Sequence, residues 1–232
     1  MNRYVVISSN AAPDYEFYVP IVRWAWKQFG WETICLRPFK INGYREETIT
    51  QVMRLYAADY RNGTDCLLMI SDADMIPLSD YWDPSPDKIT CYGHDLTGYK
   101  HQPMCYIAMS ASKWREVMNL TGDIYKDMHR DLEKSKAKSD KWEEWWQVDQ
   151  DIITDRLSKH SVVKIDRGLE PGSHLPLGRM DRAGMKWPQK PIDFHAPKNP
   201  MQHKSAIHDV LVRSFGIKYE RNEIVNYVNG RV

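Results

Sequence analysis

The sequence has no apolar stretch long enough to cross a membrane, and its N-terminal segment lacks the hydrophobic region of a secretion signal. Both absences favour a cytoplasmic protein with no membrane span. Cysteine is scarce as well, because the chain has four cysteines and no Cys-x-x-Cys pair. We therefore expect reduced, buried thiols and neither a disulfide framework nor a zinc site. In a cytoplasmic chain, the sequons at Asn62 and Asn119 are not expected to be glycosylated.

The chain also lacks a dominant charge and a glycine-rich loop. Its formal net charge is +1, so neither nucleic acid nor a membrane surface is an expected partner. The polar segment Ser8–Asp14 follows the first apolar run and contains no glycine. The missing Gly-x-Gly-x-x-Gly turn disfavours a Rossmann dinucleotide site. It also disfavours a nucleotidyltransferase that holds a triphosphate in a glycine-rich loop.

What the sequence does contain is an alternation of strand-like and helix-like segments as far as Ile70. Strands are predicted at Tyr4–Ile7, Glu32–Leu36 and Cys66–Ile70, with amphipathic helices at 15–29 and 49–60 between them. This β-α-β-α-β order is typical of a parallel sheet with helices on its faces. With 232 residues, the chain is expected to form one α/β domain with a mixed, mainly parallel central sheet.

Two acids stand directly after the third predicted strand. The run Cys66–Ile70 indicates a strand buried on both faces, and the polar residues Ser71, Asp72 and Asp74 end it abruptly. Ligands bind at the carboxyl ends of strands in open α/β sheets, and two carboxylates there suit Mg²⁺ or Mn²⁺ that carries substrate phosphates. The residues alone leave a second interpretation open, in which the two acids cap a turn or a short helix.

The alternation ends after this acidic pair. Strands are predicted at 88–92 and 104–109 with only a short connection between them, which indicates an antiparallel or mixed part of the sheet. Ser112 is predicted to cap a short helix that ends at Leu120. The densely charged segment 123–141 is predicted to be a solvated helix or a mobile stretch.

The remaining segments place polar side chains in two unusual settings. On a predicted helix over 142–157, Asp149 and Asp151 lie beside a tryptophan-rich apolar face and either point to solvent or line a pocket. A strand is predicted at 161–165, and the proline-rich segment 166–201 is predicted to be a long loop that is either functional or disordered.

The histidine of interest in that loop is His195. His101 and His174 are weaker candidates for a metal ligand. A closing helix is predicted over 203–215, followed by a polar tail that is loosely docked.

Three motifs occur in an order that resembles the GT-A class of nucleotide-sugar glycosyltransferases. They are the Asp-x-Asp at Asp72–Asp74, the Asp-Gln-Asp at Asp149–Asp151 and the His-x-x-Lys at His195–Lys198. The chain length and the opening Tyr4–Asn10 strand also look like the small GT-A enzymes encoded by large DNA viruses of algae, the chloroviruses. This resemblance implies a GT-A fold and, for a virus-encoded chain, a location in the host cytoplasm.

The resemblance also implies a role for each motif on the donor side. Asp72 and Asp74 would hold the divalent metal together with the donor ribose or diphosphate, and His195 would be a third metal ligand. Lys198 would meet the diphosphate. A set of two carboxylates and an imidazole favours Mn²⁺ over Mg²⁺. Within one domain spanning 1–232, residues 1–78 would be the nucleotide-binding half, 79–216 the acceptor half and 217–232 a tail.

Nucleoside and sugar contacts are implied in the same way. Ser8, Ser9 and Asn10 match the segment that binds the nucleoside, usually uridine, so a UDP-sugar is the expected donor and a glycan or glycoprotein the expected acceptor. Asp149, Gln150 and Asp151 match the groups placed against the transferred sugar and the acceptor. Asp151 or Asp149 could be the base that takes the acceptor proton, and so could an acid from the proline-rich segment 166–201. No dedicated nucleophile stands out, which favours inversion of the anomeric configuration.

Two alternative functions belong to other classes. One is a nucleotidyltransferase that forms sugar nucleotides on a similar sheet, and the missing glycine-rich loop counts against it. The other is a glycan-binding domain without catalysis, and the intact Asp72–Asp74 pair counts against that. The tryptophans Trp142, Trp145 and Trp146 could shape an acceptor pocket, since sugar faces pack on aromatic rings, or could belong to the core.

Overall fold

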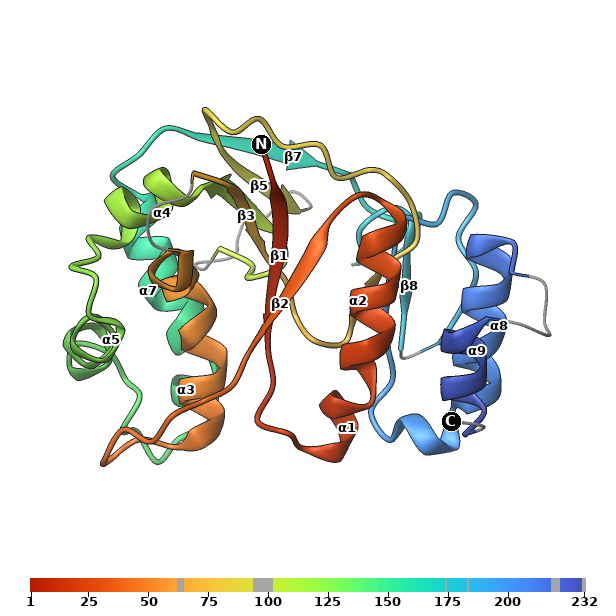
Figure 1. Ribbon diagram of the computed structural model, residues 1–232, viewed down its shortest axis with the longest axis horizontal. Coiled ribbons are helices and arrows are strands. Elements are labelled where there is room, and N and C mark those ends of the chain that lie inside the picture. Colours follow the sequence, from red (N-terminus) through yellow and green to blue (C-terminus); the bar gives the residue numbers. More distant parts are fainter. Residues whose placement is uncertain (62–64, 94–101, 174, 183, 218–221, 231–232) are drawn as a thin grey trace. The chain divides into compact units, whose positions relative to one another are not determined.

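A computed structural model of the chain describes residues 1–61, 65–93, 102–173, 175–182, 184–217 and 222–230 (Figure 1). The candidates His101 and His174 and the sequon at Asn62 lie outside the described residues. The chain separates into two compact units, each assembled from three stretches of sequence. Unit 1 comprises Met1–Asn10, Thr33–Asp72 and Pro84–Arg167, and unit 2 comprises Ala11–Glu32, Ala73–Asp83 and Gly168–Val232.

Unit 1 contains a six-stranded sheet in the order β2-β1-β3-β6-β5-β7. Its strands are β1 (Arg3–Ser8), β2 (Glu32–Leu36), β3 (Leu67–Ile70), β5 (Ile89–Gly93), β6 (Ile107–Ser110) and β7 (Val162–Asp166). β3 is parallel to β1, β5 is parallel to β7, and β6 is antiparallel to both β3 and β5. Strands β1, β3, β5 and β7 therefore share one direction and β6 opposes them. The predicted α/β class with a mixed, mainly parallel sheet is confirmed.

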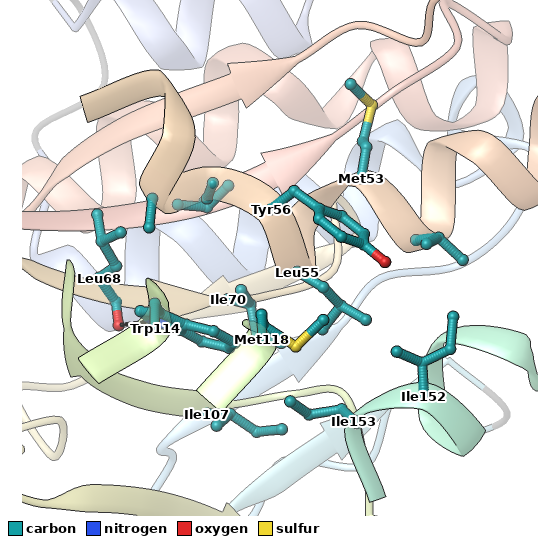
Figure 2. Packing of buried hydrophobic residues seen from close by; sticks show 14 of the residues in the cluster. Met53, Leu55, Tyr56, Leu68, Ile70, Ile107, Trp114, Met118, Ile152 and Ile153 are labelled. Atoms are coloured by element: carbon teal, nitrogen blue, oxygen red, sulfur yellow. Dashed lines mark hydrogen bonds between the residues drawn. The ribbon is translucent and has the colours of Figure 1, made fainter. Parts of the chain in front are cut away.

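Helices pack on one face of this sheet and form the core of unit 1. They are α3 (Glu46–Val52), the 3₁₀ helix η1 (Met53–Arg61), α4 (Ala111–Met118), α5 (Ile124–Glu133) and α7 (Val148–Leu157). The short helix α6 (Trp142–Trp146) precedes α7 and contributes no residue to this core. Figure 2 shows Leu68, Ile70 and Ile107 of the strands together with Trp114 and Ile153 of the helices. Because alternate strand residues share a face, Leu68 and Ile70 contribute to the same cluster.

Strand β3 lies inside the sheet, as its apolar run predicts. All four of its residues are at most 2% exposed. It pairs with β1 so that Val6 is opposite Ile70, and the backbone N–H of Ser71 donates to the carbonyl of Val6. Two residues beyond this pair, the chains reach Ser8 and Asp72, so both leave the sheet at the same carboxyl edge.

The strands predicted at Lys88–Tyr92 and Ser161–Ile165 are confirmed within a residue, whereas β6 begins later than predicted. The start at Met104 was wrong, because the described chain forms a bend and a turn before Ile107. Ser112 is not the helix cap either. The side chain of Ser110, the last residue of β6, accepts from the backbone N–H of Lys113 and caps α4.

Two predicted helices of unit 1 are real but differ in detail. The helix expected over 49–60 is α3 followed without a gap by the tighter η1. The helix expected over 142–157 is divided at Gln147 into α6 and α7. The sequence pattern cannot separate such pieces, because both share the same apolar face.

The charged segment 123–141 contains α5, which confirms the predicted helix, but the prediction that this helix is solvated was wrong for one of its faces. On that face, Asp127 and Asp131 are buried together with Met128 and Leu132. Both oxygens of Asp131 are bonded, with Tyr56 donating to one at 2.8 Å and Arg156 to the other at 2.7 Å. Buried carboxylates are tolerated there because they are paired and hydrogen-bonded.

Unit 2 is built around a three-stranded sheet in the order β4-β9-β8. Its elements are α1 (Pro13–Glu16), α2 (Tyr18–Gln28), β4 (Met75–Pro77), β8 (Arg179–Asp181), β9 (Asp193–His195), the 3₁₀ helix η2 (Pro200–Gln202), α8 (Lys204–Phe215) and α9 (Glu223–Val228). The segment 166–201, predicted to be one long loop, thus contains the two short strands β8 and β9. Three-residue strands carry no periodicity that a sequence pattern could reveal.

The helices of unit 2 include both the predicted closing helix and an unexpected one. α8 confirms the helix expected over 203–215. In the described part of the tail, α9 buries Ile224, Val225 and Val228, and the hydroxyl of Tyr227 donates to the carbonyl of Phe17 at 3.2 Å. The prediction of a loosely docked tail is therefore wrong for α9.

The four cysteines, all within the described residues, form no disulfide. The predicted burial is confirmed for Cys66 and Cys91 and is wrong for Cys35 and Cys105, which are only partly buried. Among the helices that the structure describes, none is both long and apolar enough to cross a membrane. The division into a nucleotide-binding half, an acceptor half and a tail stays a prediction.

Candidate active site

The side chain of Arg54 joins two of the predicted site residues in unit 1. Its guanidinium donates to a carboxylate oxygen of Asp72 and, over 3.1 Å, to Oδ2 of Asp149. It also donates to the carbonyl of Ser71 at 2.8 Å. The second oxygen of Asp72 accepts from the thiol of Cys105. We call Arg54, Asp72, Asp149 and Cys105 the Arg54 cluster.

The position of this cluster follows from the elements around it. Asp72 leaves the carboxyl edge of β3, Arg54 lies in the first turn of η1, and Asp149 lies in the first turn of α7. Only 5% of the Arg54 side chain is exposed, so its charge is almost fully removed from water. Such a charge is tolerated only when it is paired and hydrogen-bonded. The two carboxylates and the Ser71 carbonyl supply that pairing.

Burial and the charge of the ion-pair partner shift the pKa values of Arg54 and Asp149 in opposite directions. Burial disfavours the charged form of Arg54, but the neighbouring Asp72 and Asp149 outweigh it and raise the pKa of the guanidinium. Burial raises the pKa of Asp149 to about 6, although Arg54 acts against this shift. Asp149 therefore gains a proton at a higher pH than an ordinary aspartate.

The three residues of the Asp-Gln-Asp motif differ in accessibility. Asp149 is buried, and its Oδ1 also accepts from the backbone N–H of Gln150 at 2.8 Å. Gln150 and Asp151 are half-buried. The motif thus divides into one acid bonded within the protein and one that solvent reaches.

The segment Ser8–Asn10 lies at the same carboxyl edge as Asp72. Ser8 and Ser9 are buried and Asn10 is half-buried. The backbone N–H of Ser9 donates to the carbonyl of Leu36 at 3.1 Å, and Arg37 donates to the carbonyl of Ser9 at 3.2 Å. The edge therefore carries both predicted donor contacts of unit 1, the serine-rich segment and the first acid of the Asp-x-Asp.

In unit 2, the second acid of the motif meets the predicted histidine. Met75 pairs with His195 between antiparallel β4 and β9, and the backbone N–H of Ala196 donates to the carbonyl of Asp74 at 2.8 Å. As a result, Oδ2 of Asp74 and Nε2 of His195 lie 3.6 Å apart.

Two further residues complete this group. Nδ1 of His195 lies 3.0 Å from Oδ2 of Asp181, and the guanidinium of Arg182 contacts both Nε2 of His195 and Oδ2 of Asp74. We call Asp74, Asp181, Arg182 and His195 the His195 cluster.

The acids of this cluster dominate its electrostatics. Burial lowers the pKa of His195, but its hydrogen bond to Asp74, the charge of Asp74 and its hydrogen bond to Asp181 raise the pKa overall. The nearby hydroxyl of Tyr18 donates to the carbonyl of Pro197 at 2.6 Å. Burial and then the charge of Asp74 raise the pKa of Tyr18, which stays protonated at neutral pH.

Lys198 and the tryptophans are more exposed than the two clusters. Lys198 is on the surface of unit 2, three residues after His195. In unit 1, α6 has no buried residue, Trp142 is 55% exposed, and its ring stacks on Trp146 with centroids 5.5 Å apart. The alternative that Trp142 belongs to the core is wrong.

The fit of a divalent cation can be judged on Asp74 and His195. Two ligand atoms bound to one such cation are about 3 to 4 Å apart, since each bond is about 2.1 Å long. The 3.6 Å between Oδ2 of Asp74 and Nε2 of His195 satisfies this condition. A carboxylate oxygen and an imidazole nitrogen also form a donor set that Mn²⁺ accepts. Within the described ranges, no group of three or more His, Cys, Asp or Glu side chains is arranged as a metal site.

Sequence reasoning missed Arg54, Asp181 and Arg182. Arg54 had a detectable signal, because it interrupts the apolar residues Val52–Tyr56 of a helical segment. A charge inside an apolar stripe indicates a buried ion pair. Asp181 and Arg182 had none, since they lie in the segment whose short strands the pattern did not reveal.

The fold of the chain is that of GT-A glycosyltransferases. In the galactosyltransferase LgtC, solved with donor and acceptor sugar analogues, the match covers 97% of this chain and 99% of that chain with a TM-score of 0.51 at 14% identity. The apo form of the glycosyltransferase GlyE of Streptococcus pneumoniae TIGR4 also has a TM-score of 0.51, at 12% identity over 99% of this chain. This chain spans 63% of the length of that GlyE chain.

A more distant match is a glycosyltransferase involved in glycosylation of the major capsid of PBCV-1. It has a TM-score of 0.47 and 9% identity, and the match covers 84% of this chain and 93% of that chain. No family model and no curated protein sequence matches the chain. At these identities, the two matches with a TM-score of 0.51 show the fold alone.

Proposed function

We propose that the protein is a metal-dependent glycosyltransferase that moves a sugar from a nucleotide-diphosphate donor, a UDP-sugar, to a hydroxyl of a glycan or glycoprotein. The observation that carries this proposal is the pair formed by Asp74 and His195, whose ligand atoms are spaced for a divalent cation. Asp72 lies two residues before Asp74 and just after the carboxyl end of β3. Proteins with α/β sheets bind ligands at this end of their strands.

Asp74 and His195 would hold Mn²⁺ or Mg²⁺, and Asp72 keeps its predicted role toward the metal and the donor. Ser8, Ser9 and Asn10 would bind the nucleoside, and Lys198 would add positive charge near the diphosphate. When bound, the cation would stabilise the negative charge that develops on the departing diphosphate. The predicted division at residue 78 into nucleotide and acceptor halves belongs to this proposal.

The acceptor side needs a base that takes the hydroxyl proton as the new glycosidic bond forms. Asp151 is half-buried, whereas Asp149 is buried and bonded to Arg54. We therefore place Asp151 before Asp149 as the base, with Gln150 against the transferred sugar. Attack by the acceptor on the face opposite the diphosphate inverts the anomeric configuration.

The proposal is tested by Mn²⁺-dependent consumption of nucleotide sugars. A panel of UDP-, GDP- and dTDP-sugars is incubated with the purified protein, and sugar release is followed by NMR, which also reports the anomer. We expect turnover of a UDP-sugar that chelation abolishes and that Asp74→Asn reduces at least 100-fold. The matched control Asp209→Asn changes an exposed acid of α8 and should keep full activity.

Absence of turnover with every donor, with the wild type folded, would refute the transferase. Formation of a nucleotide sugar from a sugar phosphate and a nucleoside triphosphate would instead support the nucleotidyltransferase. Tight binding of a glycan without turnover would support the non-catalytic alternative.

A further inference from the structure

The guanidinium of Arg182 is bonded to the two atoms that would receive a cation. Its Nη1 lies 3.5 Å from Oδ2 of Asp74, and its Nη2 contacts Nε2 of His195. These are the same two atoms whose separation of 3.6 Å suits a divalent ion. About a third of the Arg182 side chain is exposed, at 31%, so the guanidinium has a route to solvent.

The contact between Arg182 and His195 fits one tautomer of the neutral imidazole. Arginine only donates, so in this tautomer Nε2 of His195 offers its lone pair to Arg182. The ring proton then lies on Nδ1, where Oδ2 of Asp181 accepts it at 3.0 Å. Asp181 is paired with His195 between parallel β8 and β9, so the two side chains lie on the same face. In this tautomer, His195 could bind a metal through Nε2 once Arg182 has left.

We propose that Arg182 is a built-in counter-ion of Asp74 and His195, and that a divalent cation binds there only by displacing it. One lone pair of His195 cannot serve both a guanidinium and a metal. Displacement frees a guanidinium that remains attached beside the site, and guanidinium groups pair well with phosphate oxygens. A nucleoside diphosphate would therefore supply partners to both cations, the metal and Arg182. Metal and nucleotide should consequently bind more tightly together than either does alone.

This inference rests on the proposed cation site and adds a competitor to it. It predicts that removal of the Arg182 charge strengthens metal binding in the absence of nucleotide. A tenfold change corresponds to about 1.4 kcal/mol, which is the scale of a partly exposed ion pair. We expect the dissociation constant for Mn²⁺ to fall about tenfold.

The experiment measures Mn²⁺ binding directly by electron paramagnetic resonance, with the wild type, Arg182→Gln and Arg182→Ala. Arg182→Gln removes the charge and keeps two hydrogen-bond donors, so it guards against misfolding of the alanine variant. The control Arg213→Ala removes the same charge from an exposed position of α8 and should leave binding unchanged. Addition of UDP should tighten Mn²⁺ binding more in the wild type than in Arg182→Gln.

If folded Arg182→Gln binds Mn²⁺ no more tightly than the wild type does without nucleotide, Arg182 does not compete with the cation. If the wild type nevertheless consumes a UDP-sugar in a Mn²⁺-dependent manner, the proposed function stands and only this inference fails. If no variant binds Mn²⁺ with or without UDP, the cation site itself is refuted, and the inference is refuted with it.

Discussion

Oδ2 of Asp181 lies 3.0 Å from Nδ1 of His195 across the paired strands β8 and β9. A carboxylate in this position orients the ring and makes Nε2 a stronger ligand. We therefore expect Asp181→Ala to weaken Mn²⁺ binding by about 10- to 100-fold, as such partners of metal-bound histidines commonly do. Asp181→Asn should recover part of the affinity, because its carbonyl still accepts from Nδ1. Unchanged Mn²⁺ binding by Asp181→Ala, measured by electron paramagnetic resonance, would contradict this role.

Arg54 should be a major determinant of stability. Arg54→Met removes the partner of buried Asp149, and loss of one member of a buried ion pair costs about 3 to 5 kcal/mol. The double variant Arg54→Met/Asp149→Leu removes both charges and should be more stable than Arg54→Met alone. The free energy of unfolding in urea measures both. The change Asp149→Leu is measured in the wild type and in Arg54→Met. If it lowers the free energy of unfolding by the same amount in both, the two residues are not coupled.

Asp149 should make stability depend on pH in an unusual direction. Its pKa is about 6 in the folded protein against an ordinary value of 3.8. Between these values the folded protein holds the proton and the unfolded chain does not, so the Asp149 contribution to stability rises as pH falls through 6. Relative to Asp149→Asn, the wild type should gain up to about 3 kcal/mol between pH 7 and pH 4.

Urea unfolding of the wild type and of Asp149→Asn at several pH values, in a buffer with chelator, gives the difference between their free energies of unfolding. If the wild type's advantage stays constant or grows as pH rises, the pKa of Asp149 is not raised. Titration of the Asp149 carboxyl carbon by NMR provides an independent value.

Gly178 should tolerate no side chain. Its φ is +78°, and a Cβ there would lie 2.6 Å from the carbonyl oxygen of Lys190. Gly30 has nearly the same φ, +77°, but no atom within 4 Å of a Cβ. Gly30→Ala should therefore cost only the strain of the left-handed conformation, about 1 to 2 kcal/mol. Gly178→Ala should lower the free energy of unfolding by at least about 2 kcal/mol more, because the backbone at Gly178 or at Lys190 must shift to relieve the clash. Equal melting temperatures of the two variants would refute the clash.

The parts of the fold that the sequence predicts well are those with a long periodic signal. Strands β1, β2 and β3 and the helices between them have continuous apolar runs or stripes, bounded by glycine or polar breaks. Local chemistry there agrees with the final packing, so the α/β class and the carboxyl edge that carries Asp72 were predictable.

The parts that the sequence concealed depend on contacts distant in the chain. β8 and β9 are too short to show a period and exist because they pair with each other and with β4. Arg54 and Asp149 are 95 residues apart, and only folding reveals that each neutralises the other. The meeting of Asp74 with His195 was an expectation from the resemblance, whereas the placement of Arg182 between them had no sequence signal.

The position of Mn²⁺ in crystals grown with UDP, located by its anomalous scattering, tests the cation site most directly. We expect one strong peak bonded to Oδ2 of Asp74 and Nε2 of His195, with the guanidinium of Arg182 moved away from both atoms. A peak elsewhere, or UDP bound while Arg182 still contacts Asp74 and His195, would contradict this expectation.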